Sequence, residues 1–266
     1  MCGAGVLPAR MAAEARRQGW RVVAFTFDDA AGLEAHVDRA IPSRFTEVDA
    51  VLTALARERV SAALFSGKFW LGDVLRATDG DAAARGIVAR AGTLTGTGLA
   101  EAVVTTLASL GIEVLDQRGF VGDWLEGAGC WTARRPTDEE WADVRRGLEL
   151  ARLCAGAGIG QTVMIKRGAV AAVEAVEGTT AAIQRGAGLA GPGAVVVKAV
   201  TPENDYRFDT PTIGPDTVEV AVAGGVAVLA VEAKRVLLLE RAALVKRADQ
   251  AGMALVGVGD GDAARR

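Results

Sequence analysis

Arg21-Val-Val-Ala-Phe-Thr-Phe27 is a run of β-branched and aromatic residues, which predicts a β-strand. Helix and strand signals alternate on both sides of it. Helices are predicted over residues 8–18, 48–58 and 100–110, and strands over 61–66 and 111–115. Because strands that alternate with helices usually pair in parallel through crossovers, this rhythm predicts a parallel sheet flanked by helices. The order of elements is also that of a Rossmann half, so we expect an N-terminal Rossmann-like domain over residues 1–131.

A second domain is predicted to follow Trp131. Thr137, with Glu140 three residues later, has the pattern of a capping box and marks the start of a helix over 138–155. Arg167-Gly168 separates two strand-like runs and predicts a hairpin. Strands are predicted over 161–166, 169–176, 194–199, 227–232, 235–239 and 254–258, the fifth as a hairpin partner of the fourth, and helices over 179–185, 215–223 and 241–251. We therefore expect a mixed α/β domain over 132–266, and α/β as the fold class of the chain.

The composition of the 266 residues excludes several classes of protein. Half of the residues are apolar and 24% are charged, so the chain can bury a core and is not disordered. Thirty basic and 33 acidic residues give a net charge of −3 without a basic patch, which argues against a nucleic acid as partner. Three widely spaced cysteines, Cys2, Cys130 and Cys154, fit a reducing compartment and exclude a disulfide framework or a cysteine zinc site.

Histidine restricts the chemistry further, because His36 is the only one in the chain. A Ser-His-Asp triad would have to use it, and no Gly-x-Ser-x-Gly elbow is present. Zinc hydrolases use two or three histidines, which disfavours them as well. Any hydrolysis would rest on Asp, Glu, Lys and Arg side chains and a hard metal ion.

The sequence carries no signal for export or for crossing a membrane. Its longest apolar run, Val220–Val231, is interrupted by Gly224-Gly225 and is shorter than the roughly 20 residues of a spanning helix. The N-terminus lacks a basic segment followed by an apolar one. We expect a soluble cytoplasmic protein.

Two short motifs could hold an anion. Gly3-Ala4-Gly5 precedes a predicted helix, and a glycine-rich loop in that place can bind phosphate through backbone N–H groups, although an ordinary turn explains it equally well. Glu174-Ala-Val-Glu177-Gly178-Thr179 lies between a strand and a helix, where Thr179 would be the N-cap and an anion would face the helix N-terminus. A capped helix with a solvated glutamate is the competing interpretation.

The densest group of polar residues follows Lys198. Alternation in an extended segment would place Asp205, Arg207 and Asp209 on one face. Two carboxylates suit Mg²⁺, while Arg207 and Lys198 can neutralise phosphate oxygens. A solvated loop with internal salt bridges accounts for the same residues.

Several long stretches resemble the two-domain, LpxI-type family of UDP-2,3-diacylglucosamine pyrophosphatases. They are Thr132–Thr137, Gly160–Val163, Ala172–Thr179, Lys198 with Asn204–Asp209, and Pro211–Val218, together with the shorter Gly3–Pro8 and Phe65–Lys68. The family motif continues Glu-Gly-Thr-Asp, whereas Thr180 stands in the last place here.

The resemblance implies a Mg²⁺-dependent hydrolase. It would convert UDP-2,3-diacylglucosamine to UMP and 2,3-diacylglucosamine 1-phosphate in lipid A synthesis, at the cytoplasmic side of the inner membrane. Asp209 and Asp205 would be the catalytic and metal-binding carboxylates. The substrate would contact Gly3, Gly5, Glu174, Glu177, Gly178, Thr179, Lys198, Arg207 and Thr212. Peripheral membrane contact and homodimerisation are left open, and Phe69, Trp70 and Trp124 are candidates for an apolar crevice that takes the acyl chains.

Two other functions remain as alternatives. One is a non-catalytic or repurposed protein that binds a nucleotide-linked ligand, which the divergent Thr180 favours. The other is a nicotinamide-linked oxidoreductase, which the βαβ order favours but Pro8 opposes, because it takes the place of a glycine of the dinucleotide fingerprint.

Overall fold

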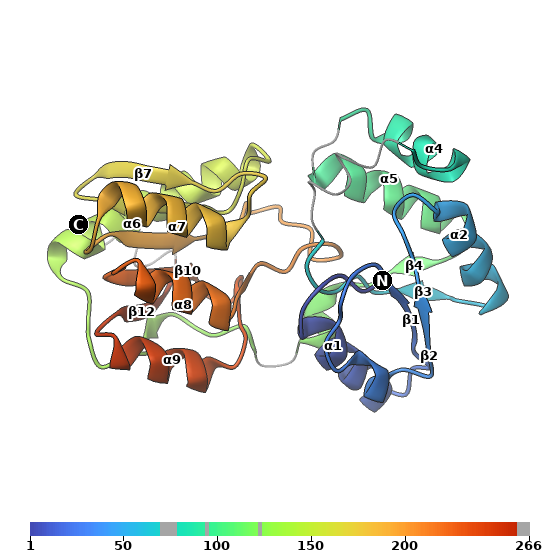
Figure 1. The fold of residues 1–266 in the computed structure, drawn as a ribbon, viewed down its shortest axis with the longest axis horizontal. Helices are drawn as coiled ribbons and strands as arrows, with labels where there is room; N and C mark the ends of the chain where they lie inside the picture. The colour runs from blue at the N-terminus through green and yellow to red at the C-terminus, as the bar shows by residue number, and fades with distance from the viewer. Residues whose placement is uncertain (70–78, 94–95, 122–123, 260–266) are drawn as a thin grey trace. The chain divides into compact units, whose positions relative to one another are not determined.

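The chain divides into two compact units. The computed structural model describes residues 1–69, 79–93, 96–121 and 124–259. Unit 1 comprises Met1–Gly122 together with Asp205–Asp209, and unit 2 comprises Asp123–Asn204 and Thr210–Arg266 (Figure 1). A five-residue segment from the second half of the sequence therefore belongs to the first unit.

Unit 2 is built on a six-stranded mixed sheet. Its order is β5-β12-β10-β8-β6-β7, where the strands are β5 (Gly129–Cys130), β6 (Thr162–Lys166), β7 (Ala169–Val173), β8 (Val195–Lys198), β10 (Val228–Glu232) and β12 (Ala254–Val258). The central strands β8, β10 and β12 are parallel, whereas β6 is antiparallel to both β8 and β7. The predicted hairpin between β6 and β7 is confirmed, and the mixed α/β fold of this part is as expected.

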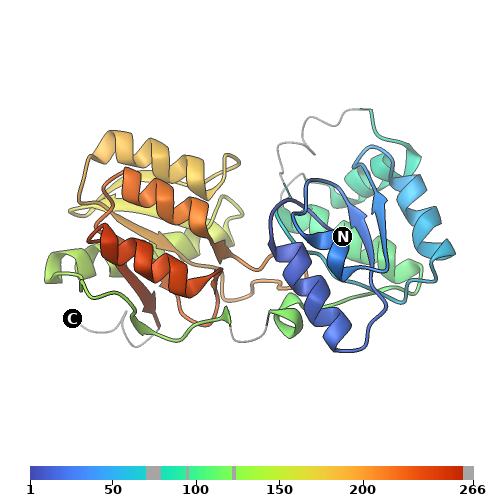
Figure 2. The ribbon, with the colours of Figure 1, turned by 60° about the horizontal axis from the view of Figure 1, so that its bottom comes forward.

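Helices cover both faces of this sheet (Figure 2). Helix α6 (Asp138–Gly156) packs on one face, and α7 (Thr179–Ala190), α8 (Pro215–Ala223) and α9 (Arg241–Gln250) pack on the other. The period of two along each strand decides which residues face which helices. In β8, Val195 and Val197 pack in the core under α6, while Val196 packs in the core under α7 and α8.

The start of α6 follows the sequence pattern closely. Thr137 Oγ1 accepts a hydrogen bond from the Glu140 amide, and the Glu140 carboxylate accepts one from the Thr137 amide. The predicted capping box is therefore confirmed, and it satisfies two backbone donors at this helix end.

One strand of unit 2 pairs differently from the prediction. β11 (Leu237–Leu238) is not a hairpin partner of β10; it lies parallel to β9 (Thr212–Ile213), with the Leu237 amide donating to the Pro211 carbonyl. The chain turns away after β10 through Lys234, whose φ of 60° is left-handed. No pattern among residues close in the sequence indicates whether β11 pairs with β10 or with β9.

Unit 1 contains two short parallel sheets. β1 (Val23–Thr26) pairs with β2 (Arg39–Pro42), and β3 (Ala62–Ala63) pairs with β4 (Glu113–Val114). The residue Cys2 forms isolated bridges to Thr26 and to Ser66. The expected parallel direction is confirmed for these pairs, but strand pairing in this unit does not define the continuous sheet of a Rossmann-like domain.

The described residues of unit 1 form the helices α1 (Leu7–Arg17), α2 (Val48–Arg57), α4 (Ala82–Ala91) and α5 (Gly96–Ser109), with the 3-10 turns η1 (Leu33–His36) and η2 (Gln117–Phe120). Helix α1 and η1 contribute to one buried cluster, whereas α2 and α5 pack on a small core of their own. Phe25, Leu55, Leu107 and Ile112 are buried in this core. Among the helices described in either unit, none combines the length and apolar character needed to cross a bilayer.

Two glycines of α7 provide a test of this packing. A Cβ on Gly186 would lie 2.9 Å from Ala172 Cβ, whereas a Cβ on Gly188 would meet nothing within 4 Å. We expect Gly186→Ala to lower the free energy of unfolding by about 1 to 3 kcal/mol through overpacking. Gly188→Ala, the matched control, should be neutral or stabilising by up to about 1 kcal/mol, because alanine favours a helix. Urea denaturation measures both, and equal effects would contradict the packing of α7 on β7.

Candidate active site

The carboxyl ends of three strands of unit 2 meet at one edge of the sheet. β7 and β8 are both antiparallel to β6, so they run in the same direction as β10. Glu174 follows β7, Lys198 ends β8, and the N-terminus of α7 begins at Thr179. Ligands of open α/β sheets commonly bind at such an edge.

Three of the predicted residues form a buried cluster at this edge, called here the Lys198 cluster: Glu174, Thr179 and Lys198. Lys198 Nζ donates to Thr179 Oγ1 at 2.7 Å, and Thr179 Oγ1 donates to Glu174 Oε1 at 2.9 Å. Lys198 Nζ also lies 3.8 Å from Glu174 Oε2. Lys198 is 4% exposed and Glu174 9%, so the ammonium and the carboxylate compensate each other's charge away from bulk water.

The N-cap of α7 is Gly178, at a φ of 82°, and not Thr179. The Thr179 hydroxyl is therefore not used for capping and is available to the Lys198 cluster. The first turn of α7 carries no acidic residue, so its N–H groups present a positive end of the helix dipole. This arrangement suits an anionic ligand, with Lys198 as the countercharge.

A residue that sequence reasoning missed adds to this edge. Thr162 pairs in register with Lys198, is 2% exposed, and its Oγ1 finds no hydrogen-bond partner among the described residues. A buried hydroxyl without a partner is uncommon and fits a place where a ligand oxygen accepts its proton. Only the register of β6 against β8 reveals it, because nothing in the sequence of the strand sets Thr162 apart.

Glu232, the last residue of β10, was also missed. Its Oε2 accepts a hydrogen bond from the Val200 amide at 2.9 Å, and its Oε1 accepts from Arg152 Nη2 of α6 at 2.6 Å. Glu232 therefore braces the backbone directly after Lys198. The sequence signal that could have revealed Glu232 is its place as an acidic residue at the end of an otherwise apolar predicted strand.

Two further predicted residues of unit 2 lie apart from these contacts. Glu177 accepts hydrogen bonds from Arg185 and from the Ala175 amide, and the Arg185 guanidinium holds the pKa of Glu177 below its usual range. Thr212 Oγ1 donates to the Thr210 carbonyl at 2.8 Å. The hydrogen bonds described above thus bring together Glu174, Thr179 and Lys198, whereas Glu177 and Thr212 bond other residues.

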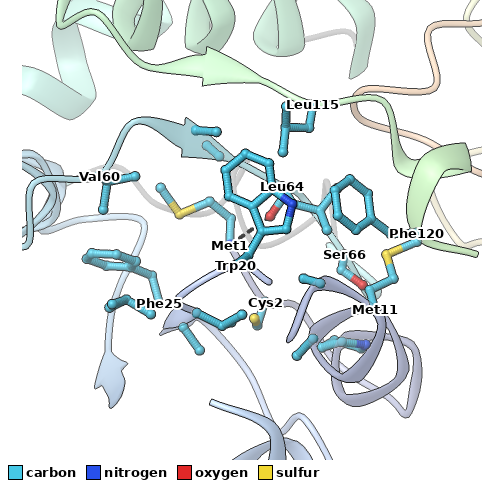
Figure 3. A pocket seen from close by; sticks show the side chains of 18 of the residues that line it. Met1, Cys2, Met11, Trp20, Phe25, Val60, Leu64, Ser66, Leu115 and Phe120 are labelled. Carbon is cyan, nitrogen blue, oxygen red and sulfur yellow. Dashed lines mark hydrogen bonds between the residues drawn. The ribbon is translucent and has the colours of Figure 1, made fainter. Parts of the chain in front are cut away.

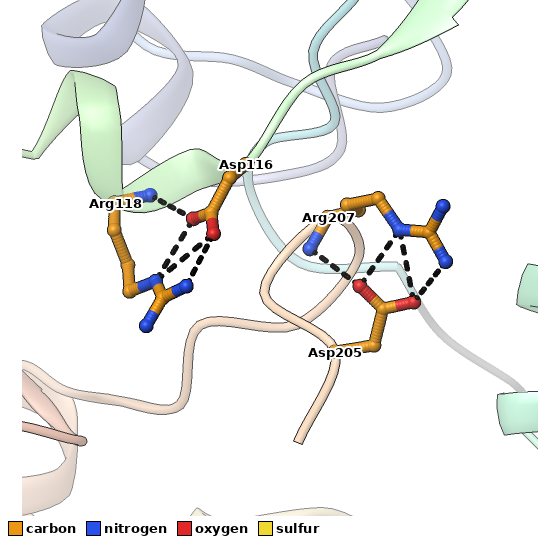
Figure 4. Close-up of polar contacts among 4 residues, drawn as sticks. All are labelled: Asp116, Arg118, Asp205 and Arg207. Atoms are coloured by element: carbon orange, nitrogen blue, oxygen red, sulfur yellow. Dashed lines mark hydrogen bonds and ion pairs between the residues drawn. The ribbon is translucent and has the colours of Figure 1, made fainter. Parts of the chain in front are cut away.

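Asp205, Arg207 and Asp209 lie in unit 1, in a turn and not in the extended segment that alternation predicted. The Asp205 carbonyl accepts hydrogen bonds from the amides of Phe208 and Asp209. Arg207 donates to both carboxylate oxygens of Asp205, from Nε at 2.9 Å and from Nη2 at 2.7 Å (Figure 4). These hydrogen bonds lower the pKa of Asp205, whose carboxylate is therefore committed to Arg207. Asp209 is exposed, whereas Asp205 is partly buried.

Gly3 allows close backbone packing, whereas Gly5 has a left-handed φ of 98° and a Cβ there would meet nothing within 4 Å. Their amides donate to the carbonyls of Ser66 and Asp29, and the Ala4 amide donates to the Lys68 carbonyl. A Cβ on Gly3 would lie 2.3 Å from the Lys68 carbonyl oxygen. These three N–H groups are engaged with the backbone, so the phosphate cradle suggested by the sequence is not formed by them.

Unit 1 also contains an apolar hollow beside Met1 (Figure 3). Side chains of Met11, Trp20, Phe25 and Phe120 line it, and the Met1 ammonium donates to the Leu64 carbonyl at 2.9 Å. Among the described residues, its lining includes Arg21 but no carboxylate and none of the predicted site residues.

The aromatic residues suggested for an acyl crevice are accounted for only in part. Phe69 packs edge-on against Phe27, Phe45 and Phe65 in unit 1. Trp70 lies outside the described residues, and Trp124 belongs to unit 2. Packing against other aromatic rings is the observed role of Phe69.

The donor chemistry for Mg²⁺ is limited. Within the described ranges, no three His, Cys, Asp or Glu side chains gather into a set that could hold a metal ion. Mg²⁺ commonly uses one or two carboxylates together with phosphate oxygens of the substrate. Asp209 is the more exposed of the two aspartates, and the Asp205 carboxylate binds Arg207 through both of its oxygens.

These features define a two-unit α/β protein with the buried Lys198 cluster in one unit and a loop that carries the exposed Asp209 in the other. The family models agree with this description: the LpxI N-terminal domain matches residues 1–124 and the LpxI C-terminal domain matches residues 127–256. The chain belongs to the LpxI family. A relative from Caulobacter vibrioides, named UDP-2,3-diacylglucosamine pyrophosphatase LpxI, is 34% identical over 158 residues. That match spans 56% of each chain, so this protein aligns with about half the length of the relative.

The Lys198 cluster predicts a large coupling between its two charges. Lys198→Met leaves the Glu174 carboxylate buried without a countercharge and should cost about 3 to 5 kcal/mol in the free energy of unfolding. The double variant Glu174→Gln/Lys198→Met should recover most of that loss, because it buries no unpaired charge. Chemical denaturation measures the loss in the free energy of unfolding for Glu174→Gln, for Lys198→Met and for the double variant. If the two single losses simply add up in the double variant, the coupling is contradicted.

The Asp205–Arg207 pair predicts a pH dependence. Because the folded pKa of Asp205 is lowered, the pair stabilises the fold above the unfolded pKa, near 3.9, and its contribution is lost as the pH falls through the folded value. Asp205→Asn should reduce the free energy of unfolding at pH 7 by less than about 1 kcal/mol, since the pair is partly exposed. The difference in the free energy of unfolding between the wild type and Asp205→Asn should become smaller below pH ~4. In an Arg207→Gln background the same substitution should show no such pH dependence, and a deficit that stays constant with pH would contradict the pairing.

Proposed function

We propose that this protein hydrolyses the pyrophosphate bond of UDP-2,3-diacylglucosamine and releases UMP and 2,3-diacylglucosamine 1-phosphate, a step of lipid A biosynthesis. Membership of the LpxI family and the name of the Caulobacter relative support the substrate. The observation that carries the proposal is the buried Lys198 cluster, since a lysine at a helix N-terminus suits a phosphate oxygen.

Unit 2 would supply phosphate binding. The Lys198 ammonium would neutralise negative charge that develops on the phosphate oxygens, and the first N–H groups of α7 would add oriented dipoles. The Thr162 hydroxyl would donate a hydrogen bond to the same ligand. Glu174 and Thr179 would keep the ammonium oriented, so that it meets the substrate without rearrangement.

Asp209 would act on the water. A water oxygen forms a bond to one of the two phosphorus atoms, the bridging P–O bond breaks with its electron pair going to the departing phosphate, and the water proton passes to the Asp209 carboxylate. The single histidine of the chain makes a carboxylate the natural acceptor. Arg207 would stabilise the departing negative charge.

Mg²⁺ would be held by Asp209 and by phosphate oxygens of the substrate. When bound, the ion would neutralise negative charge on the diphosphate. Asp205 would serve mainly to orient Arg207, as its two hydrogen-bonded oxygens indicate.

Unit 1 would be a Rossmann-type half in which Met1–Ala4 acts as the central strand. The hydrogen bonds from the Cys2 amide to the Phe25 carbonyl and from the Gly3 amide to the Ser66 carbonyl support this order of segments.

A cytoplasmic protein that meets the inner membrane peripherally, alone or as a homodimer, would fit a lipid substrate.

A non-catalytic UDP-sugar binder is the second candidate. The observation in its favour is Thr180, which stands in the first turn of α7 where the family motif has Asp. Saturable binding of UDP-diacylglucosamine without UMP release, with and without Mg²⁺, would identify this function.

The catalytic role of Asp209 has a direct test. Asp209→Ala should reduce UMP release from UDP-diacylglucosamine by at least about a hundredfold, because the water loses its proton acceptor. The melting temperature should stay unchanged, because the side chain is exposed. Glu203 is also exposed but precedes the loop Asp205–Asp209, and it provides the control Glu203→Ala, which should retain activity. Near-normal turnover by purified Asp209→Ala protein would refute the role, and running the reaction in ¹⁸O-water would locate the attacked phosphorus.

A further inference from the structure

Two tripeptides of unit 1 fold into matching turns, called here the paired turns: Asp116-Gln117-Arg118 and Asp205-Tyr206-Arg207. In each, the arginine amide donates to Oδ1 of the aspartate two residues before it, at 2.8 and 3.0 Å respectively. In each, the arginine Nε bonds both carboxylate oxygens and Nη2 bonds Oδ2 (Figure 4). Each aspartate has a lowered pKa caused first by its arginine.

The paired turns are joined through their middle residues. The Gln117 amide donates to the Tyr206 carbonyl at 2.9 Å, and the Arg118 guanidinium lies 4.4 Å from the centre of the Tyr206 ring. Gln117 is 2% exposed and Tyr206 7%, so this junction is buried. Further along the loop, the Phe208 ring lies 5.0 Å from the Phe65 ring.

These contacts fix the backbone on both sides of Arg207, and Asp209 follows two residues later. The loop Asp205–Asp209 thus takes its conformation from unit 1, although the chain before and after it belongs to unit 2. Arg118 itself is about half exposed and pairs with a neighbouring aspartate, an arrangement that adds little to global stability. Its contact with Tyr206 is therefore better suited to setting the loop than to holding the fold.

We propose that the turn Asp116–Arg118 holds the loop Asp205–Asp209 in its conformation. Gln117 and Arg118 are thereby positioning residues for the carboxylate of Asp209. This inference rests on the proposed role of Asp209 in hydrolysis. A displacement of a catalytic group by about 1 Å can cost roughly a hundredfold in rate, so a cation–π contact and one backbone hydrogen bond are sufficient to matter.

The test uses the full chain and two readouts. Arg118→Ala removes the cation–π contact. Gln117→Pro removes both the N–H donor at the first position of η2, where proline is tolerated, and the side-chain amide that donates to the Arg207 carbonyl. We expect each to lower kcat for UMP release roughly tenfold, with KM changed less than about twofold. Amide hydrogen exchange should become faster for residues 206–209 and stay unchanged in β6 and β8. Arg118→Lys, which keeps a cation over the ring, should recover part of the kcat.

Arg247→Ala is the matched control, because Arg247 forms a similar two-bond ion pair with Glu219 in unit 2, whereas the loop belongs to unit 1. It should leave kcat and the exchange of residues 206–209 at wild-type values. Wild-type kcat and exchange in both turn variants would overturn the proposal, as would faster exchange spread evenly over unit 1. If the wild-type protein releases no UMP, the proposed function fails. Amide hydrogen exchange of residues 206–209 in the turn variants still decides whether the turn Asp116–Arg118 holds the loop.

Discussion

The charge of Lys198, buried at the edge of the sheet of unit 2, is the constraint on which the rest of that unit depends. An ammonium removed from water needs a countercharge and hydrogen-bond acceptors, and Glu174 and Thr179 supply them. Both come from the segment that leaves β7 and enters α7, so the pair also fixes where that helix begins. Glu232 then braces the backbone beyond β8. The buried charge of Lys198 thus holds together the ends of β7 and β8 and the start of α7.

The fold of unit 2 was largely predictable because its signals are local. The capping box of Thr137 and Glu140 and the turn at Arg167-Gly168 each depend on residues close in sequence. The pairing of β11 with β9 was not predictable, because it is decided by contacts between segments distant in the chain. In unit 1, a few hydrogen bonds of Cys2 and Gly3 determine how the short strands relate, and no periodicity in the sequence records them.

The candidate site was predictable in its residue types and less so in its contacts. Sequence reasoning selected Glu174, Thr179 and Lys198, and the structure brings these three together. It treated Asp205, Arg207 and Asp209 as one face of a strand, whereas a turn pairs Asp205 with Arg207 and leaves Asp209 exposed. Thr162 could not be found, since an unremarkable threonine becomes notable only when its hydroxyl is buried without a partner.

The membership of Asp205–Asp209 in unit 1 has a consequence for how such proteins recombine. A hybrid made by joining the first half of one homologue to the second half of another would inherit Tyr206 and Phe208 from one parent and Gln117 and Phe65 from the other. Mismatched partners would disturb the loop even if both halves fold well. A working hybrid therefore needs a second junction in its sequence, so that residues 205–209 come from the same parent as unit 1.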